Sequence, residues 1–207
     1  MSKDNTMTRK RAFNPHSYYH VIMRGNNRQN IFKTREDMLE LMRAFEHVHI
    51  SYPFTMLAYC FMTNHYHILI KPDEAPLDKI MGLVNRRYSD SYAKRYGHIG
   101  RIYQKRFFAK EVNTRTGLLI VSSYIHRNPI DTIIPMVERL ESYPYSSYPL
   151  YWDESKSAPT FLNREFLKSL LLPPFENTNK SYCEYCLSSR QTAEEDRHIE
   201  DIEAPFF

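Results

Sequence analysis

The sequence predicts an α+β domain in which helices pack on one face of an antiparallel, ferredoxin-like sheet. Two observations lead to that fold class. Short segments rich in aromatic and β-branched residues alternate in the way of strands, and longer segments between them repeat apolar residues every three or four positions, as helices do. A chain of 207 residues, 42% hydrophobic and 25% charged, is long enough for one such domain with a core.

The elements are expected in the order strand, helix, strand pair, helix, strand, helix. Thr34 and Asp37 form a capping-box pattern at the start of the first helix. Gly97 and Gly100 end the second helix, and Thr114 is suited to cap the third. The expected strands are residues 17–24, 54–61, 66–70 and 106–112. The first expected helix begins at 34 and ends before Pro53, the second covers about 77–96, and the third runs from 114 to 128.

Three regions divide the chain: a basic arm (1–16), a central domain (17–150) and an extension of unknown role (151–207), partly helical near 161–172 and acidic at its end. No run of about 18 apolar residues is present, which excludes a membrane span, and the polar start lacks a secretory signal. Three cysteines fit a reducing cytosol better than a disulfide scaffold. We therefore expect a cytoplasmic protein.

Positive charge is concentrated in the middle of the chain. Between Arg86 and Lys110, eight basic residues stand against one acidic residue, and tyrosines and phenylalanines lie among them. Such a stretch suits a partner with phosphates and stackable bases. A solvated helix face above core aromatics would give the same pattern, so charge alone leaves nucleic-acid binding and a plain charged surface open.

Two pairs of histidines have one residue between them. His47 and His49 fall near the end of the first expected helix, where residues two apart diverge by about 200°. His65 and His67 open an expected strand, where residues two apart share a face and can reach one metal ion. Two histidines are an incomplete metal site, however, and satisfied polar residues on an exposed sheet face remain an alternative.

A reactive group and a further ligand are available on the third expected helix. Tyr124 and Asn128 are four residues apart, so both project from one helix face. A metal held by the histidine pair would polarise a phosphate while a tyrosine attacks phosphorus. The pattern alone does not select Tyr124 among 16 tyrosines, since an aromatic residue on an amphipathic helix is usually part of the core.

Five separated motifs resemble the single-tyrosine transposases of the HUH endonuclease superfamily, and most of all their branch associated with REP elements. Along the chain they are SYYHV with RGNNR (17–28), TNHYHIL (63–69), IYQKRF (102–107), YIHRNP (124–129) and YPYSSY (143–148), and this order is the family's. Tyr103 stands where many relatives carry tryptophan, which concerns base stacking more than chemistry.

The resemblance assigns roles to individual residues. It implies that His65, His67 and Asn128 bind Mg²⁺ or Mn²⁺, and that Tyr124 cuts single-stranded DNA beside a hairpin or palindromic repeat through a 5′-phosphotyrosine. Rejoining reverses that step, and a homodimer is compatible with the family. The protein would then be associated with the nucleoid when bound to DNA. The basic residues expected to hold the DNA are Arg9, Lys10, Arg11, Arg24, Arg28, Arg86, Arg87, Lys94, Arg95, Arg101, Lys105 and Arg106.

Two other functions remain open at this point. A domesticated relative would bind a single-stranded DNA or RNA hairpin without cutting it, and a hydrolytic nuclease would use metal-bound water and form no adduct. Cys183 and Cys186 have the spacing of half a zinc site, but the second ligand pair is missing unless His198 and a distant residue join. We favour two unlinked thiols.

Overall fold

The computed structural model describes residues 12–188. A four-stranded antiparallel sheet with the strand order β2-β3-β1-β4 lies at its centre. The strands are β1 (Tyr18–Arg24), β2 (Phe54–Phe61), β3 (His65–Pro72) and β4 (Phe108–Val112). The α-helices are α1 (Arg35–Ser51), α2 (Leu77–Tyr96), α3 (Arg115–Arg127), α4 (Tyr148–Trp152), α5 (Glu165–Ser169) and α6 (Asn179–Ser188), with short 3-10 helices η1 (Asn26–Arg28) and η2 (Leu140–Ser142).

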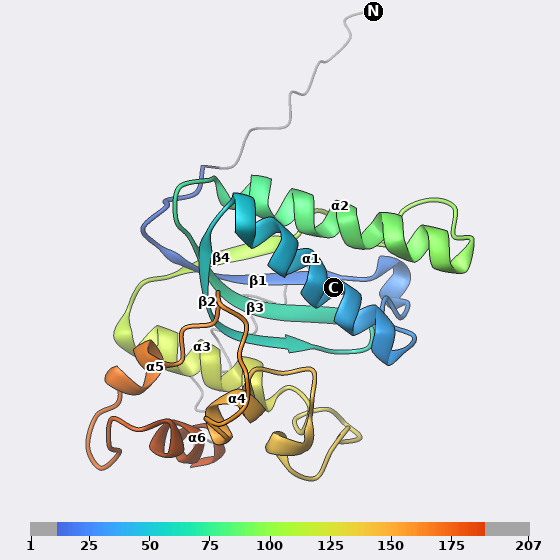
Figure 1. The fold of residues 1–207 in the computed structure, drawn as a ribbon. Coiled ribbons are helices and arrows are strands. Elements are labelled where there is room, and N and C mark those ends of the chain that lie inside the picture. Colours follow the sequence, from blue (N-terminus) through green and yellow to red (C-terminus); the bar gives the residue numbers. More distant parts are fainter. Residues whose placement is uncertain (1–11, 189–207) are drawn as a thin grey trace, which may run out of the picture.

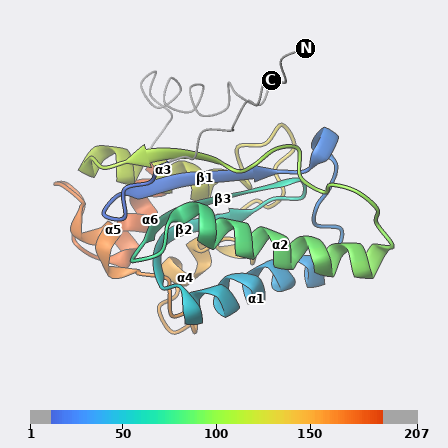
Figure 2. The ribbon, with the colours of Figure 1, turned by 90° about the horizontal axis from the view of Figure 1, so that it is seen from above.

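Helices cover both faces of the sheet. Tyr66 of β3 packs its ring against Phe45 of α1 and donates its hydroxyl to Asn85 of α2. The next residue, His67, points to the opposite face and lies against Tyr124 of α3. Figures 1 and 2 show α1 and α2 together on one side of the sheet and α3 with α6 on the other. The predicted α+β class is confirmed. The prediction that the helices pack on one face of the sheet holds for α1 and α2 but not for α3, which lies on the opposite face.

The signals at the helix ends have the predicted geometry. The Asp37 carboxylate accepts hydrogen bonds from the backbone N–H groups of Lys33 (2.8 Å) and Thr34 (2.9 Å) at the start of α1. The Thr114 hydroxyl accepts from Gly117 N–H at 3.0 Å and caps α3. Gly97 ends α2 in the left-handed region at φ +60°. The expected strand at 106–112 is shorter than predicted and begins at Phe108.

The chain after residue 150 shares the core of the domain. Phe161 and Leu162 belong to the same buried cluster as the strands, and the backbone around them pairs with Met56 of β2 through N–H···O contacts of 2.7 and 2.9 Å. Earlier in the chain, Tyr145 O accepts from Phe61 N–H at 2.9 Å. These segments cover the outer edge of β2, which would otherwise expose unpaired backbone groups. The helix expected near 161–172 is reduced to α5.

A buried histidine, His126, connects α3 to the segments that pack on the side of the helix away from Tyr124. His126 lies between a ring nitrogen contact to Ser147 Oγ (Nε2, 2.7 Å) and one to the Tyr182 hydroxyl (Nδ1, 3.0 Å) on α6. Helix residues two apart point in nearly opposite directions. With His126 held against the 140s segment and α6, Tyr124 is therefore turned toward the sheet.

Cys183 and Cys186 are buried in α6 and form no disulfide, and burial raises the pKa of both thiols. None of the helices within residues 12–188 is long and apolar enough to cross a bilayer. The acidic end of the chain, with His198, and the basic residues Arg9, Lys10 and Arg11 lie outside the described residues.

The turn after β1 requires glycine. A Cβ added to Gly25 would lie 2.2 Å from the backbone oxygen of Gln29 and 2.9 Å from Ile31 Cγ2. We predict that Gly25→Ala lowers the free energy of unfolding by about 1–3 kcal/mol, because the backbone must shift to relieve the overlap.

In the exposed interior of α2, an added Cβ at Gly82 meets nothing within 4 Å. Gly82→Ala should instead stabilise by about 0.5–1 kcal/mol. Urea unfolding of both variants measures the contrast, and equal effects would contradict it.

Candidate active site

Two histidines of β3 and a tyrosine of α3 meet on one face of the sheet. The ring centroids of His65 and His67 are 4.9 Å apart, and those of His67 and Tyr124 are 5.4 Å apart. The strand pairing sets this arrangement, because His65 lies opposite Arg24 and His67 opposite Ile22 on β1. Residues directly opposite in an antiparallel pair share a face. The predicted convergence of His65 and His67 is therefore present, with Tyr124 beside them.

The first histidine is held by an asparagine at each side. Asn64 donates its amide Nδ2 to the backbone oxygen of Arg28 at 3.1 Å, so its Oδ1 is the atom that lies 2.6 Å from His65 Nδ1. An amide oxygen only accepts, and Nδ1 must therefore carry the proton. The lone pair of His65 is then on Nε2, the nitrogen directed away from Asn64.

Asn128 closes α3 next to that histidine. Its Nδ2 donates to the backbone oxygen of Tyr124 at 2.9 Å, which leaves Oδ1 as the atom that can face His65. Burial, followed by the charge of Arg24, lowers the pKa of His65 to about 4, and the hydrogen bond that the Asn128 side chain would accept from the protonated ring acts in the opposite direction. At neutral pH the site thus combines a neutral imidazole with an amide oxygen.

The second histidine has one nitrogen with no hydrogen-bond partner. His67 is fully buried, and within residues 12–188 nothing hydrogen-bonds to its Nε2. Burial, followed by the nearby His65, His20 and Arg24, lowers its pKa well below the usual value. The ring is therefore neutral at physiological pH, with a nitrogen available to a ligand.

The donor atoms fit a divalent cation. In the described part of the chain no three His, Cys, Asp or Glu side chains form a complete metal site. Two neutral imidazoles and one amide oxygen leave open positions for water and phosphate oxygens. Oxygen ligands suit both Mg²⁺ and Mn²⁺, so water and phosphate oxygens would complete the coordination of either cation.

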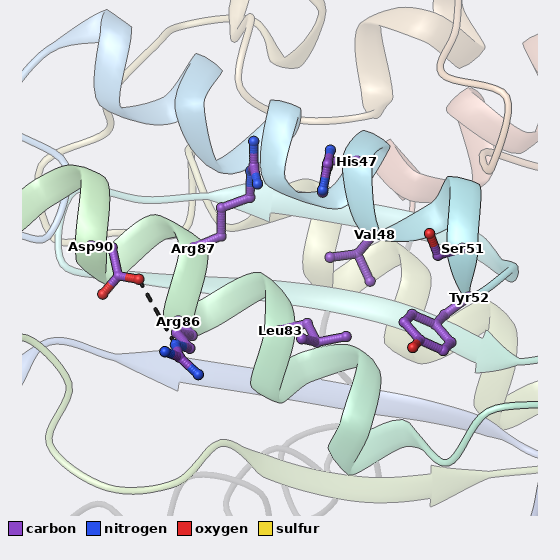
Figure 3. A pocket seen from close by; sticks show the side chains of 8 residues that line it. All are labelled: His47, Val48, Ser51, Tyr52, Leu83, Arg86, Arg87 and Asp90. Atoms are coloured by element: carbon purple, nitrogen blue, oxygen red, sulfur yellow. Dashed lines mark ion pairs between the residues drawn. The ribbon is translucent and has the colours of Figure 1, made fainter.

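The other histidine pair is separated, as predicted. His49 is half-buried, where its Nδ1 accepts from the backbone N–H of Phe54 at 3.3 Å and its ring packs on Phe161. His47 is exposed and lines a groove between α1 and α2 together with Arg86 and Arg87 (Figure 3). That groove lies on the α1–α2 face, across the sheet from Tyr124.

The predicted DNA-binding residues do not form one patch. Arg24 is the last residue of β1 and lies opposite His65. The backbone oxygen of Arg24 accepts a hydrogen bond from the backbone N–H of Gln104 at 3.1 Å, so Lys105 and Arg106 follow close to this end of the strand. Arg95 instead forms an ion pair of 2.8 Å with the buried Asp37 of α1. Arg28, Lys94 and Arg101 are exposed.

Two residues on the site's face were missed from the sequence. His20 of β1 is fully buried, and its Nε2 lies 3.0 Å from His67 Nδ1. Lys110 of β4 lies opposite His20, so it shares the face of the histidines. The alternation of β1 contains the signal for His20, but its relation to His67 depends on strand register, which the sequence does not give.

The family model for IS200-like transposases matches residues 14–128, more than half of the chain. The chain belongs to the IS200-like transposase family. The matched segment of the transposase runs from the turn before β1 to Asn128 and thus includes both histidines and Tyr124. None of the curated proteins matches the sequence.

Among solved structures, the transposase is similar to a REP-associated tyrosine transposase bound to a REP hairpin, with 16% identity, a TM-score of 0.59, and coverage of 79% of this chain and 92% of that one. At this identity the similarity concerns the fold. A crystal structure described as a transposase from Deinococcus radiodurans (13% identity, TM-score 0.40, 55% and 92% coverage) and tRNA(His) guanylyltransferase from Saccharomyces cerevisiae (13%, 0.41, 89% and 86%) are too distant in structure to support an argument.

Proposed function

We propose that this transposase cleaves and rejoins single-stranded DNA beside a hairpin, with Tyr124 as the nucleophile. The observation that supports this best is the position of the Tyr124 ring, 5.4 Å from the ring of His67, whose buried Nε2 lacks a hydrogen-bond partner within residues 12–188. If a cation binds at that nitrogen and a phosphate oxygen binds to the cation, the phosphorus would lie near the Tyr124 phenol, whose oxygen can then attack it.

The proposed step exchanges one phosphodiester for another. The Tyr124 oxygen forms a bond to phosphorus, the bond from phosphorus to the 3′ oxygen breaks, and the phenolic proton is lost while the leaving oxygen gains one. The products are a 5′-phosphotyrosine and a free 3′-hydroxyl. Attack by another 3′-hydroxyl reverses the exchange, so rejoining needs no external energy source.

His65, His67 and Asn128 would hold Mg²⁺ or Mn²⁺, which when bound neutralises charge that develops on a phosphate oxygen. The protein prepares these donors in advance. Asn64 fixes the proton of His65 on Nδ1, and the helix end fixes the amide of Asn128. Their neutral state at physiological pH means that no proton has to leave before a cation binds.

A hairpin is the substrate feature that we infer from relatives. The structurally similar REP-associated transposase is described as bound to a REP hairpin. To test the proposed function, the full chain is mixed with a labelled single strand carrying a palindromic hairpin and Mn²⁺, and the products are run on a denaturing gel. A protein–DNA adduct is expected. Products without an adduct would indicate a hydrolytic nuclease, and binding without products a domesticated module; both would overturn the proposal.

The position of the site also predicts which basic residues hold the DNA. Lys110 shares the face of the histidines, whereas Arg87 lines the α1–α2 groove on the other face. We expect Lys110→Ala to weaken hairpin binding and to lower the salt slope of log K by about 0.7, the loss of one single-strand phosphate contact. Arg87→Ala should leave the slope nearly unchanged. Binding titrations at several salt concentrations measure both slopes, and a larger effect at Arg87 would contradict the assignment.

A further inference from the structure

His20 has a contact that the proposed chemistry has not used. Its side chain is fully buried on β1, its Nε2 lies 3.0 Å from His67 Nδ1, and its ring centroid is 5.9 Å from that of Tyr124. A hydrogen bond between two neutral imidazoles has one proton, and the ring that donates it has its lone pair on its other nitrogen. The direction of this bond therefore decides what His67 presents to the site.

Only one direction gives His67 the state of a metal ligand. If His67 Nδ1–H donates to His20 Nε2, the buried Nε2 of His67 carries a lone pair that a cation can use. If His20 donates instead, His67 Nε2 carries a proton and cannot coordinate a cation. His65 meets the same requirement through Asn64, whose oxygen lies at its Nδ1. Both strand histidines are thus contacted at Nδ1, and the Nε2 of His67 has no hydrogen-bond partner among the described residues.

We propose that His20 is a positioning residue: it accepts the Nδ1 proton of His67 and so fixes the tautomer and ring orientation that let His67 Nε2 bind the cation. The inference rests on the proposed function, since it concerns the same metal-binding pair. Partners that hold the remote nitrogen of a ligating histidine typically contribute about 10- to 100-fold to metal affinity.

Two variants at position 20 separate the proposed role from packing, because one offers a hydrogen-bond acceptor and the other does not. In His20→Leu the acceptor is lost and an apolar side chain fills part of the space, whereas in His20→Gln an amide oxygen can reach the His67 Nδ1 proton. Both remove the buried imidazole, so a purely packing role predicts similar effects. Thermal unfolding of each variant shows whether the fold is retained.

Metal affinity is measured with Mn²⁺ alone, through the loss of the aqueous Mn²⁺ EPR signal. We expect His20→Leu to raise the Kd for Mn²⁺ about 10- to 100-fold and His20→Gln to restore most of the affinity. Equal weakening by both, or an unchanged Kd in His20→Leu, would overturn the inference. A second readout is the ¹⁵N NMR spectrum of the metal-free protein, in which His67 should carry its proton on Nδ1 in the wild type and lose that preference in His20→Leu. A proton on His67 Nε2 in the wild type would also overturn the inference.

Failure of this inference and failure of the proposed function give different results. If Mn²⁺ binding is lost in His67→Ala but unchanged in His20→Leu, the metal site stands and His20 has no positioning role. If the wild-type protein binds no Mn²⁺ through His65 and His67, the proposed function fails, and the NMR tautomer of His67 still decides the role of His20.

Discussion

Tyr124→Phe is expected to abolish the covalent protein–DNA adduct, with a loss of at least about a thousandfold in cleavage, because only the attacking oxygen is removed. The ring, which packs at 5.4 Å from His67 and 5.9 Å from His20, is kept. Folding and hairpin affinity should therefore remain close to those of the wild type. The measurement is a denaturing gel of labelled hairpin DNA after incubation with Mn²⁺, together with a binding titration.

The matched control is Tyr18→Phe, which removes the hydroxyl of another half-buried tyrosine, stacked on Phe166. This variant should form the adduct at the wild-type rate. Retained adduct in Tyr124→Phe would show that a different tyrosine is the nucleophile.

Much of the fold follows from local patterns. The start of α1, the end of α2 and the start of α3 are set by Asp37, Gly97 and Thr114, whose capping contacts or backbone angles involve only neighbouring residues. Alternation along β3 likewise puts His65 and His67 on one face without any knowledge of the remaining chain. Short-range physical chemistry is enough for such features.

Features that join distant segments could not be predicted from the sequence. Helices cover both faces of the sheet, so successive residues along β1, β2 and β3 are buried whichever face they point to. The sequence of such a strand does not say which helix covers which face. The roles of His20 and His126 depend on strand register and on α6, respectively. Tyr124 was selected among the tyrosines by family resemblance, and its position beside His67 is a tertiary contact that periodicity does not give.

The second large effect concerns the metal. His67→Ala removes the buried imidazole whose Nε2 has no hydrogen-bond partner within residues 12–188, and we expect Mn²⁺ affinity to fall at least about 100-fold and adduct formation to be lost. EDTA should have the same effect on the wild-type protein, and added Mn²⁺ should reverse it. Because both imidazoles are neutral at physiological pH, binding should be nearly independent of pH between about 6 and 8.

A cavity at position 67 also costs stability, so activity alone would not separate the two causes. His67→Leu keeps more of the side-chain volume without offering a donor atom, and should lose Mn²⁺ binding while unfolding closer to the wild-type temperature. His47→Ala, at an exposed histidine in the groove across the sheet, serves as the control and should bind Mn²⁺ normally. If the adduct forms in EDTA, or if His67→Leu cleaves like the wild type, the chemistry does not pass through this histidine pair. In that case the contact between His67 and Tyr124 would be one of packing.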